Sequence, residues 1–156
     1  MAIRFFFDGV SFQLKNKRKI SQWLRHVAAA ERKKTGNLSF IFVTDEIIRD
    51  INKKYLQHDD YTDIITFDNS SGDTISGEMY ISVDTVRINA NEYQASFHDE
   101  LFRVMIHGAL HLCGYKDKTT DEQQEMGTAE DKYLTRIASL APFLSLNQKF
   151  DLPIFC

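Results

Sequence analysis

Residues 107–117 read His-Gly-Ala-Leu-His-Leu-Cys-Gly-Tyr-Lys-Asp, and this stretch decides how the middle of the chain folds. It closes a segment, Phe97 to Cys113, in which apolar residues cover nearly every side at 100° per residue. This pattern is typical of a helix that is buried in a core. Gly114 follows at once and can adopt a positive φ. We therefore expect a buried helix that ends at this glycine, where the chain turns back.

The polar residues of the expected helix form one narrow stripe, which consists of Glu100, Arg103, His107 and His111. Two histidines four residues apart have Cβ atoms roughly 5–6 Å apart on one helix face, so both imidazoles can reach one ion. The turn at Gly114 would bring Asp117 to the same ion as a third ligand. Three protein ligands leave a fourth position for water, which is typical of a catalytic zinc site. The alternative is a pair of core histidines that are hydrogen-bonded to carbonyl groups. The spacing favours one Zn²⁺ per chain, held by His107, His111 and Asp117.

The ligand spacing matches the metzincin pattern, with Asp117 in the place of the third histidine. Metallopeptidases with the His-Glu-x-x-His motif use its glutamate as a general base. The corresponding residue here is Gly108, which cannot transfer a proton. A metallopeptidase is therefore disfavoured, and the ion must activate water without that base unless another residue supplies it.

Apolar periodicity and turn residues predict the remaining elements. Strands are expected at residues 3–7, 38–43, 62–67 and 75–83, and further helices at residues 17–34, 45–55, 84–95 and 119–137. Asp84 is expected to cap the helix that it begins. The order predicts an α+β fold in which about five helices, including the metzincin-like metal helix, pack on a single mixed four-stranded sheet. Residues 1–140 are expected to form one domain, followed by a C-terminal tail at 141–156.

The composition is ordinary for a globular protein, since 43% of the 156 residues are hydrophobic and 26% are charged. Two distant cysteines without a secretory signal favour a reducing compartment, so we expect a cytoplasmic protein. No apolar run approaches about 18 residues, which argues against a membrane span. The net charge is −3, yet residues 15–34 carry eight Lys and Arg residues against Glu31 alone. This basic segment is either a footprint for a phosphate backbone or a solvated helix surface.

Residues 107–115 resemble the signature of the YbeY family, which comprises bacterial metal-dependent endoribonucleases and ribosomal RNA maturation factors. A second block is similar to another family segment: residues 51–55, then Asp59, then residues 62–67. A third and weaker block at residues 77–82 resembles the family's Gly-Asp-Ile-x-Ile. The three blocks follow one another in the family's order and span most of residues 40–135.

Two positions depart from the family pattern. The family signature usually ends in Gly-Tyr-Asp-His, and the last histidine is its third zinc ligand, whereas this chain has Asp117. A carboxylate adds negative charge, which is expected to weaken the Lewis acidity of the ion and to broaden the choice of metal. An arginine commonly follows the family's tyrosine, and Leu56 stands there instead. Lys53, Lys54 or His58 are the candidates to bind substrate in its place.

The resemblance implies a zinc-dependent, single-strand-specific endoribonuclease that acts in ribosomal RNA processing and in maturation of the small ribosomal subunit. Ribosomal RNA, the small subunit and ribosome assembly factors are the implied partners. A metal-bound water would attack the phosphate. Glu78 and Asp63 are candidates to protonate the leaving oxygen, and Glu100 is a candidate hydrogen-bond partner of a ligand. The alternative is a non-catalytic ribosome assembly or RNA-binding factor that zinc stabilises.

Overall fold

The computed structural model describes residues 2–57 and 62–138, so the expected tail at 141–156 lies outside the described residues. The predicted order of elements is confirmed: β1 (Ile3–Phe7), α1 (Lys17–Ala30), β2 (Lys34–Val43), α2 (Asp45–Leu56), β3 (Ile64–Asp68), β4 (Thr74–Ser82), α3 (Val83–Glu92), α4 (Phe97–Leu112) and α5 (Thr120–Ala138). In this part of the chain, no helix combines the length and the apolar character that crossing a bilayer requires.

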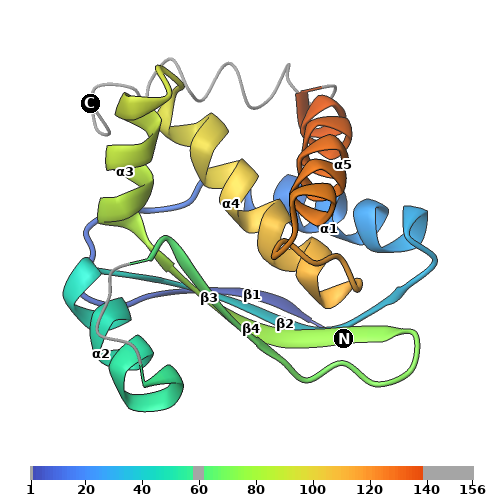
Figure 1. Ribbon diagram of the computed structural model, residues 1–156, viewed down its shortest axis with the longest axis horizontal. Coiled ribbons are helices and arrows are strands. Elements are labelled where there is room, and N and C mark those ends of the chain that lie inside the picture. Colours follow the sequence, from blue (N-terminus) through green and yellow to red (C-terminus); the bar gives the residue numbers. More distant parts are fainter. Residues whose placement is uncertain (1, 58–61, 139–156) are drawn as a thin grey trace.

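The four strands form one mixed sheet, as predicted, and their order within it is β1-β2-β4-β3. β1, β2 and β4 run parallel, and β3 pairs antiparallel with β4 at one edge. Figure 1 shows α2 on one face of the sheet and α1, α4 and α5 on the other. The edge strand β3 therefore separates two surfaces, one beneath α4 and one beside α2.

Alternating side chains of the sheet build the core on both faces, as the two-residue period of a strand requires. Phe40, Phe42 and Met79 are fully buried against α1 and α4 in the main core. A smaller apolar cluster on the other face joins β-strand residues to α2 and includes Ile48 and Ile65. α4 is buried over most of its surface, which confirms the prediction from its apolar sequence.

Two glycines bring the C-terminal half of α4 close to the sheet. A Cβ atom on Gly108 would lie 2.7 Å from Cδ1 of Ile64 and 3.1 Å from Sδ of Met79. A Cβ atom on Gly77 in β4 would lie 2.4 Å from the carbonyl oxygen of Phe67. Position 108 thus faces the sheet at close quarters, and the glutamate of a peptidase would require Ile64 and Met79 to move.

Several boundaries differ from the prediction, and β2 begins at Lys34 rather than at residue 38. The first helix ends at Ala30 rather than near residue 34, because Arg32 adopts a left-handed conformation with φ 61°. The amide groups of Arg32 and Lys33 donate to the carbonyl oxygens of Ala29 and Ala28, which is a Schellman ending without glycine. Four residues of the predicted helix are therefore available to the turn and to the start of β2.

The predicted cap at Asp84 is wrong. Ser82 caps α3 instead, since its side chain accepts a hydrogen bond from the amide of Thr85. The carboxylate of Asp84 accepts from the amide of Asp45, at 3.0 Å, at the first turn of α2. Asp84 therefore joins two helices that lie 39 residues apart in the sequence.

Candidate metal centre

The three predicted ligands meet at the C-terminal end of α4. Nε2 of His107 and Nε2 of His111 lie 3.0 Å apart, and each lies 3.2 Å from Oδ2 of Asp117. Ligand atoms around a tetrahedral ion with bonds of about 2.0–2.1 Å are roughly 3.3 Å apart. The three atoms therefore form a triangle of the size of one face of such a tetrahedron, and this cluster is able to hold a metal ion.

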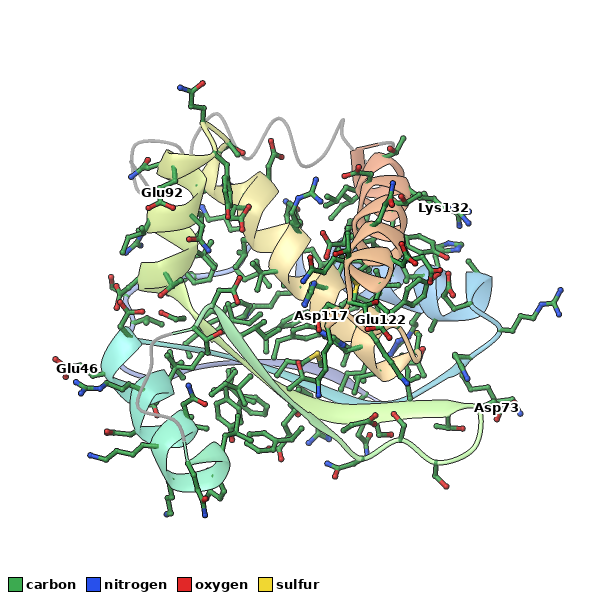
Figure 2. All side chains as sticks on the ribbon, in the orientation of Figure 1. Glu46, Asp73, Glu92, Asp117, Glu122 and Lys132 are labelled. Atoms are coloured by element: carbon green, nitrogen blue, oxygen red, sulfur yellow. The ribbon has the colours of Figure 1, made fainter. Side chains whose placement is uncertain are left out.

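The turn after α4 places the third member of the cluster. Gly114 has φ 109°, which confirms the expected left-handed glycine at the end of the helix. Figure 2 shows Asp117 in the connection between α4 and α5, on the side of the molecule where α4 ends. A four-residue helical spacing and one glycine turn are thus sufficient to assemble the triangle.

Hydrogen bonds on the far side of each ring orient the two histidines. Nδ1 of His107 lies 2.7 Å from Oε2 of Glu130, and Nδ1 of His111 lies 3.0 Å from the carbonyl oxygen of Tyr115. Since a carboxylate and a carbonyl only accept, we assign the ring proton to Nδ1 in both residues. Both Nε2 lone pairs and a carboxylate oxygen then converge without a proton between them. Three converging acceptors repel one another unless a cation lies among them, so the donor set fits a metal.

Tyr115 holds His111 from a wider network. Its hydroxyl donates to Oε2 of Glu31 at 3.2 Å, and the hydroxyl of Tyr133 donates to the same oxygen. The carbonyl oxygen of Tyr133 in turn accepts from Nε1 of Trp23, at 2.8 Å. The loop that carries the backbone partner of His111 is therefore attached to α1 and to α5.

Glu130 is the functional residue that the sequence analysis missed. It lies on α5, is only 7% exposed, and also accepts from Nη1 of Arg103 at 3.0 Å. Glu130, and not Glu100, is therefore the acidic partner of a histidine ligand. Glu130 could have been recognised from the sequence, because it lies on the apolar stripe of α5 between Met126 and Tyr133. A carboxylate that is buried in such a stripe needs a hydrogen-bond or charge partner.

We expect Glu130→Gln to weaken metal binding by about 10-fold and Glu130→Ala by up to about 100-fold, as for other groups that hold a ligand in place. The glutamine keeps an acceptor for Nδ1 of His107 but loses the charge. The measurement is a competition titration of zinc against a chelating dye. Glu125→Gln, at an exposed position of the same helix, is the control. Equal affinities in all four proteins would contradict the role of Glu130.

Two further carboxyl groups near the cluster have a raised pKa, mainly because they are buried. Burial raises the pKa of Asp63, and His107 only partly opposes this effect. Burial, followed by repulsion from Asp63, raises the pKa of Glu100 to about 7, although Arg103 acts in the opposite direction. Burial of His107 favours its neutral form, but the bond and charge of Glu130, with Asp117 and Asp63, produce a net rise in its pKa.

The shift at Glu100 predicts how stability depends on pH in the metal-free protein. The folded chain holds this proton up to about pH 7, whereas an unfolded chain releases it near its ordinary pKa of about 4.3. Folding therefore takes up a proton in this interval, and the free energy of unfolding falls as the pH rises from 5 to 7. We expect Glu100→Gln to reduce this slope, because only the Asp63 and His107 contributions remain, and to make the variant more stable than wild type at pH 8 by on the order of 2 kcal/mol.

Urea unfolding at pH 5 and pH 8, after removal of metal, measures this difference. Glu92→Gln, an exposed position on α3, is the matched control and should keep the slope of the wild type. A Glu100→Gln protein with the same loss of stability between the two pH values as wild type would disprove the assignment to this carboxyl group.

The cluster opens into a cleft of about 760 Å³ between α2, β3 and the end of α4. We call it the metal cleft, and its walls include Asp63, Thr66 and Asp68. Lys118, which the sequence analysis did not single out, also lines it. Leu56 lines it too and is 45% exposed. The position at which the family pattern described above has an arginine therefore faces the cleft.

The other predicted site residues lie elsewhere. Lys53 and Lys54 are exposed on α2, but neither forms part of the wall of the metal cleft. His58 lies outside the described residues. Glu78 is exposed and lines a different cavity on the α2 face of the sheet. None of residues 15–34, which carry the basic segment, lines the metal cleft.

Comparisons with known proteins identify the family of the chain. The family model described as Endoribonuclease YbeY matches residues 8–138. A protein named Endoribonuclease YbeY from Bacteroides thetaiotaomicron is 48% identical over 134 residues, which is 86% of this chain and 98% of that protein. A protein of the same name from Christiangramia forsetii is 46% identical and covers 81% of this chain and 89% of its own length.

A solved structure gives the same result for the fold. The solution structure of TM1509 from Thermotoga maritima superimposes with a TM-score of 0.62 at 28% sequence identity. The match covers 85% of this chain and 87% of that one. The resemblance inferred from residues 51–67, 77–82 and 107–115 is thereby confirmed. The chain belongs to the endoribonuclease YbeY family.

Proposed function

We propose that this protein is a zinc-dependent endoribonuclease that cleaves single-stranded RNA in ribosomal RNA processing and in maturation of the small ribosomal subunit. The observation that carries the proposal is the triangle of three converging ligand atoms at the wall of an open cleft. The endoribonuclease names of the similar proteins support the reaction class. A cytoplasmic location and ribosome assembly factors as partners belong to the same proposal.

His107, His111 and Asp117, which line the metal cleft, would hold the ion. A zinc ion held in this way lowers the pKa of bound water toward about 7 and polarises a phosphate oxygen. Lys118 lies on the cleft wall, where it would pair with a backbone phosphate. Phosphate contacts of this kind position a strand without reading its sequence. The chain thus supplies ligands and a cation on one wall.

Asp63 is the residue that we assign to proton transfer. It lines the metal cleft, and burial raises its pKa, so its carboxyl group retains a proton more readily than an exposed one does. A retained proton can pass to the oxygen that leaves when the phosphodiester bond breaks. Glu78, the other candidate, lines the cavity on the α2 face and is not among the residues of the metal cleft.

Two residues of the sequence affect the expected choice of metal and the expected binding of RNA. Because Asp117 is a carboxylate, we expect the site to accept Mn²⁺ more readily than a site with three histidines does. Because Leu56 brings no charge to the cleft, Lys53, Lys54 and His58 remain the proposed substrate-binding residues on α2 and beyond it. Lys54 contacts the ring of Tyr55, with Nζ 5.4 Å from the ring centre.

RNA cleavage with controlled metal content tests the proposal. Protein purified without added metal is incubated with labelled single-stranded RNA and with the same strand in a duplex. We expect cleavage of the single strand, loss of cleavage after chelation, and recovery when zinc is restored. His26→Ala, at an exposed position of α1, should keep full activity. RNA binding without cleavage in every metal state would instead favour a non-catalytic assembly factor.

A further inference from the structure

We propose that a second cavity beside the metal cleft binds one unpaired nucleobase of the RNA substrate. The cavity lies on the α2 face of the sheet, has a volume of about 310 Å³, and is lined by Ile51, Tyr55, Phe67, Asn69, Glu78 and Tyr80. We call it the aromatic pocket. Its volume is at the lower end of small-ligand sites, so it suits one ring system rather than a longer ligand. The inference rests on the proposed function, because it names where the same RNA is held.

Three aromatic rings form the pocket and offer surfaces for stacking. Tyr55 and Phe67 meet edge to face at 5.7 Å between ring centres, and Phe67 and Tyr80 do so at 5.9 Å. Although it makes this contact, Tyr55 is 60% exposed. Solvent-exposed aromatic side chains beside a nucleic-acid path are the usual stacking platforms for single-stranded bases.

Polar groups within the pocket distinguish a base from a purely apolar ligand. Phe67 and Glu78 are paired across β3 and β4, so their side chains lie next to each other on the same face. The exposed carboxylate of Glu78 can accept a hydrogen bond from an amino group of adenine, cytosine or guanine. Burial, then the charges of Glu78 and Tyr55, raise the pKa of Tyr80, so its hydroxyl remains a donor. The pocket therefore offers both an acceptor and a donor to the edge of a base that stacks on its rings.

The aromatic pocket and the metal cleft share the same structural elements. Tyr55 lines the pocket, and the next residue, Leu56, lines the cleft. Phe67 lines the pocket, whereas its neighbours Thr66 and Asp68 line the cleft. The two cavities thus lie on either side of the edge strand β3, and one RNA strand that crosses this edge can reach both.

A cation stands at the rim of the pocket. Nζ of Lys54 lies over the ring of Tyr55, 5.4 Å from its centre. This position would allow the ammonium group to pair with a phosphate while the neighbouring base stacks on the ring. The arrangement gives Lys54 a specific place in substrate binding, outside the metal cleft.

Steady-state cleavage and base fluorescence with the zinc-loaded protein test the inference. The probe is a short single-stranded oligouridine RNA that carries one 2-aminopurine, whose fluorescence reports stacking. We expect Tyr55→Ala to raise KM by roughly 10-fold with kcat unchanged and to abolish the fluorescence change. Tyr55→Phe should behave as wild type, because it keeps the ring. Glu78→Gln, which removes the charged acceptor at the edge of the base, should raise KM for the same probe by less than Tyr55→Ala does.

Tyr93→Ala is the matched control, because Tyr93 is 66% exposed at the end of α3 and does not line the aromatic pocket. Circular dichroism confirms that each variant is folded, as expected for exposed positions. If wild type cleaves the RNA and Tyr55→Ala has the same KM and the same fluorescence change, the pocket inference is overturned while the nuclease remains. If wild type neither binds nor cleaves any RNA, the proposed function itself fails.

Discussion

His111→Ala is expected to lose its tightly bound zinc and at least about 100-fold of its RNA cleavage, while it keeps its fold. One of three ligand atoms is removed, and the loss should exceed the 10- to 100-fold effect of groups that only support a ligand. The remaining Nε2 of His107 and Oδ2 of Asp117 cannot enclose an ion by themselves. Elemental analysis of metal per chain, together with the cleavage assay, measures both effects.

The same measurements on His26→Ala control for the loss of an imidazole at an exposed site. Because His111 is half-buried at the end of α4, circular dichroism should show a folded variant. Full cleavage by a folded, metal-free His111→Ala protein would refute the assignment of this cluster to catalysis. Normal metal content with full cleavage would refute the assignment of His111 as a ligand.

Gly108→Glu is expected to lower the free energy of unfolding by about 4 kcal/mol or more and to produce no peptidase activity. The new side chain would need the space that Ile64 and Met79 occupy, since even a Cβ atom would approach Cδ1 of Ile64 to 2.7 Å. Overpacking of this kind typically costs about 1–3 kcal/mol. Burying an uncompensated carboxylate adds a further penalty of several kcal/mol. Urea unfolding measures the loss of stability.

Gly127→Glu provides the comparison on α5, because a Cβ atom there meets nothing within 4 Å. That variant should be at least as stable as wild type, since glutamate favours a helix over glycine by up to about 1 kcal/mol. An unchanged unfolding curve for Gly108→Glu would show that α4 can move away from the sheet. Cleavage of unstructured peptides by Gly108→Glu would contradict the expected lack of activity, and cleavage of them by the wild type would reinstate the metallopeptidase interpretation.

Local patterns predicted the ligand triangle because all three members come from one helix and the turn that follows it. His107 and His111 need only helical spacing, and Gly114 needs only its left-handed conformation to bring Asp117 back. The order of strands and helices was equally accessible, since each element carries its own apolar period. Both the ligand triangle and the order of the elements can therefore be read from short stretches of sequence.

The rest depends on contacts between elements that are distant in the sequence. Glu130 reaches His107 because α5 packs on α4, which no local pattern encodes. Asp84 joins α2 for a similar reason. The end of α1 was misplaced because a Schellman ending formed at Arg32, and a residue other than glycine seldom adopts the positive φ that this ending requires.

The hydrogen bonds from Tyr115 have a consequence for the amount of protein in a cell. The carbonyl oxygen of Tyr115 orients His111, and its hydroxyl holds Glu31, which also accepts from Tyr133. A metal ion bound by the ligand triangle therefore favours the packing of α1 and α5 against the loop that carries Tyr115. The free energy of metal binding then adds to the free energy of unfolding. Under metal scarcity we expect a larger unfolded fraction and faster degradation. A shortage of the metal ion would then lower the amount of the protein in the cell as well as its activity.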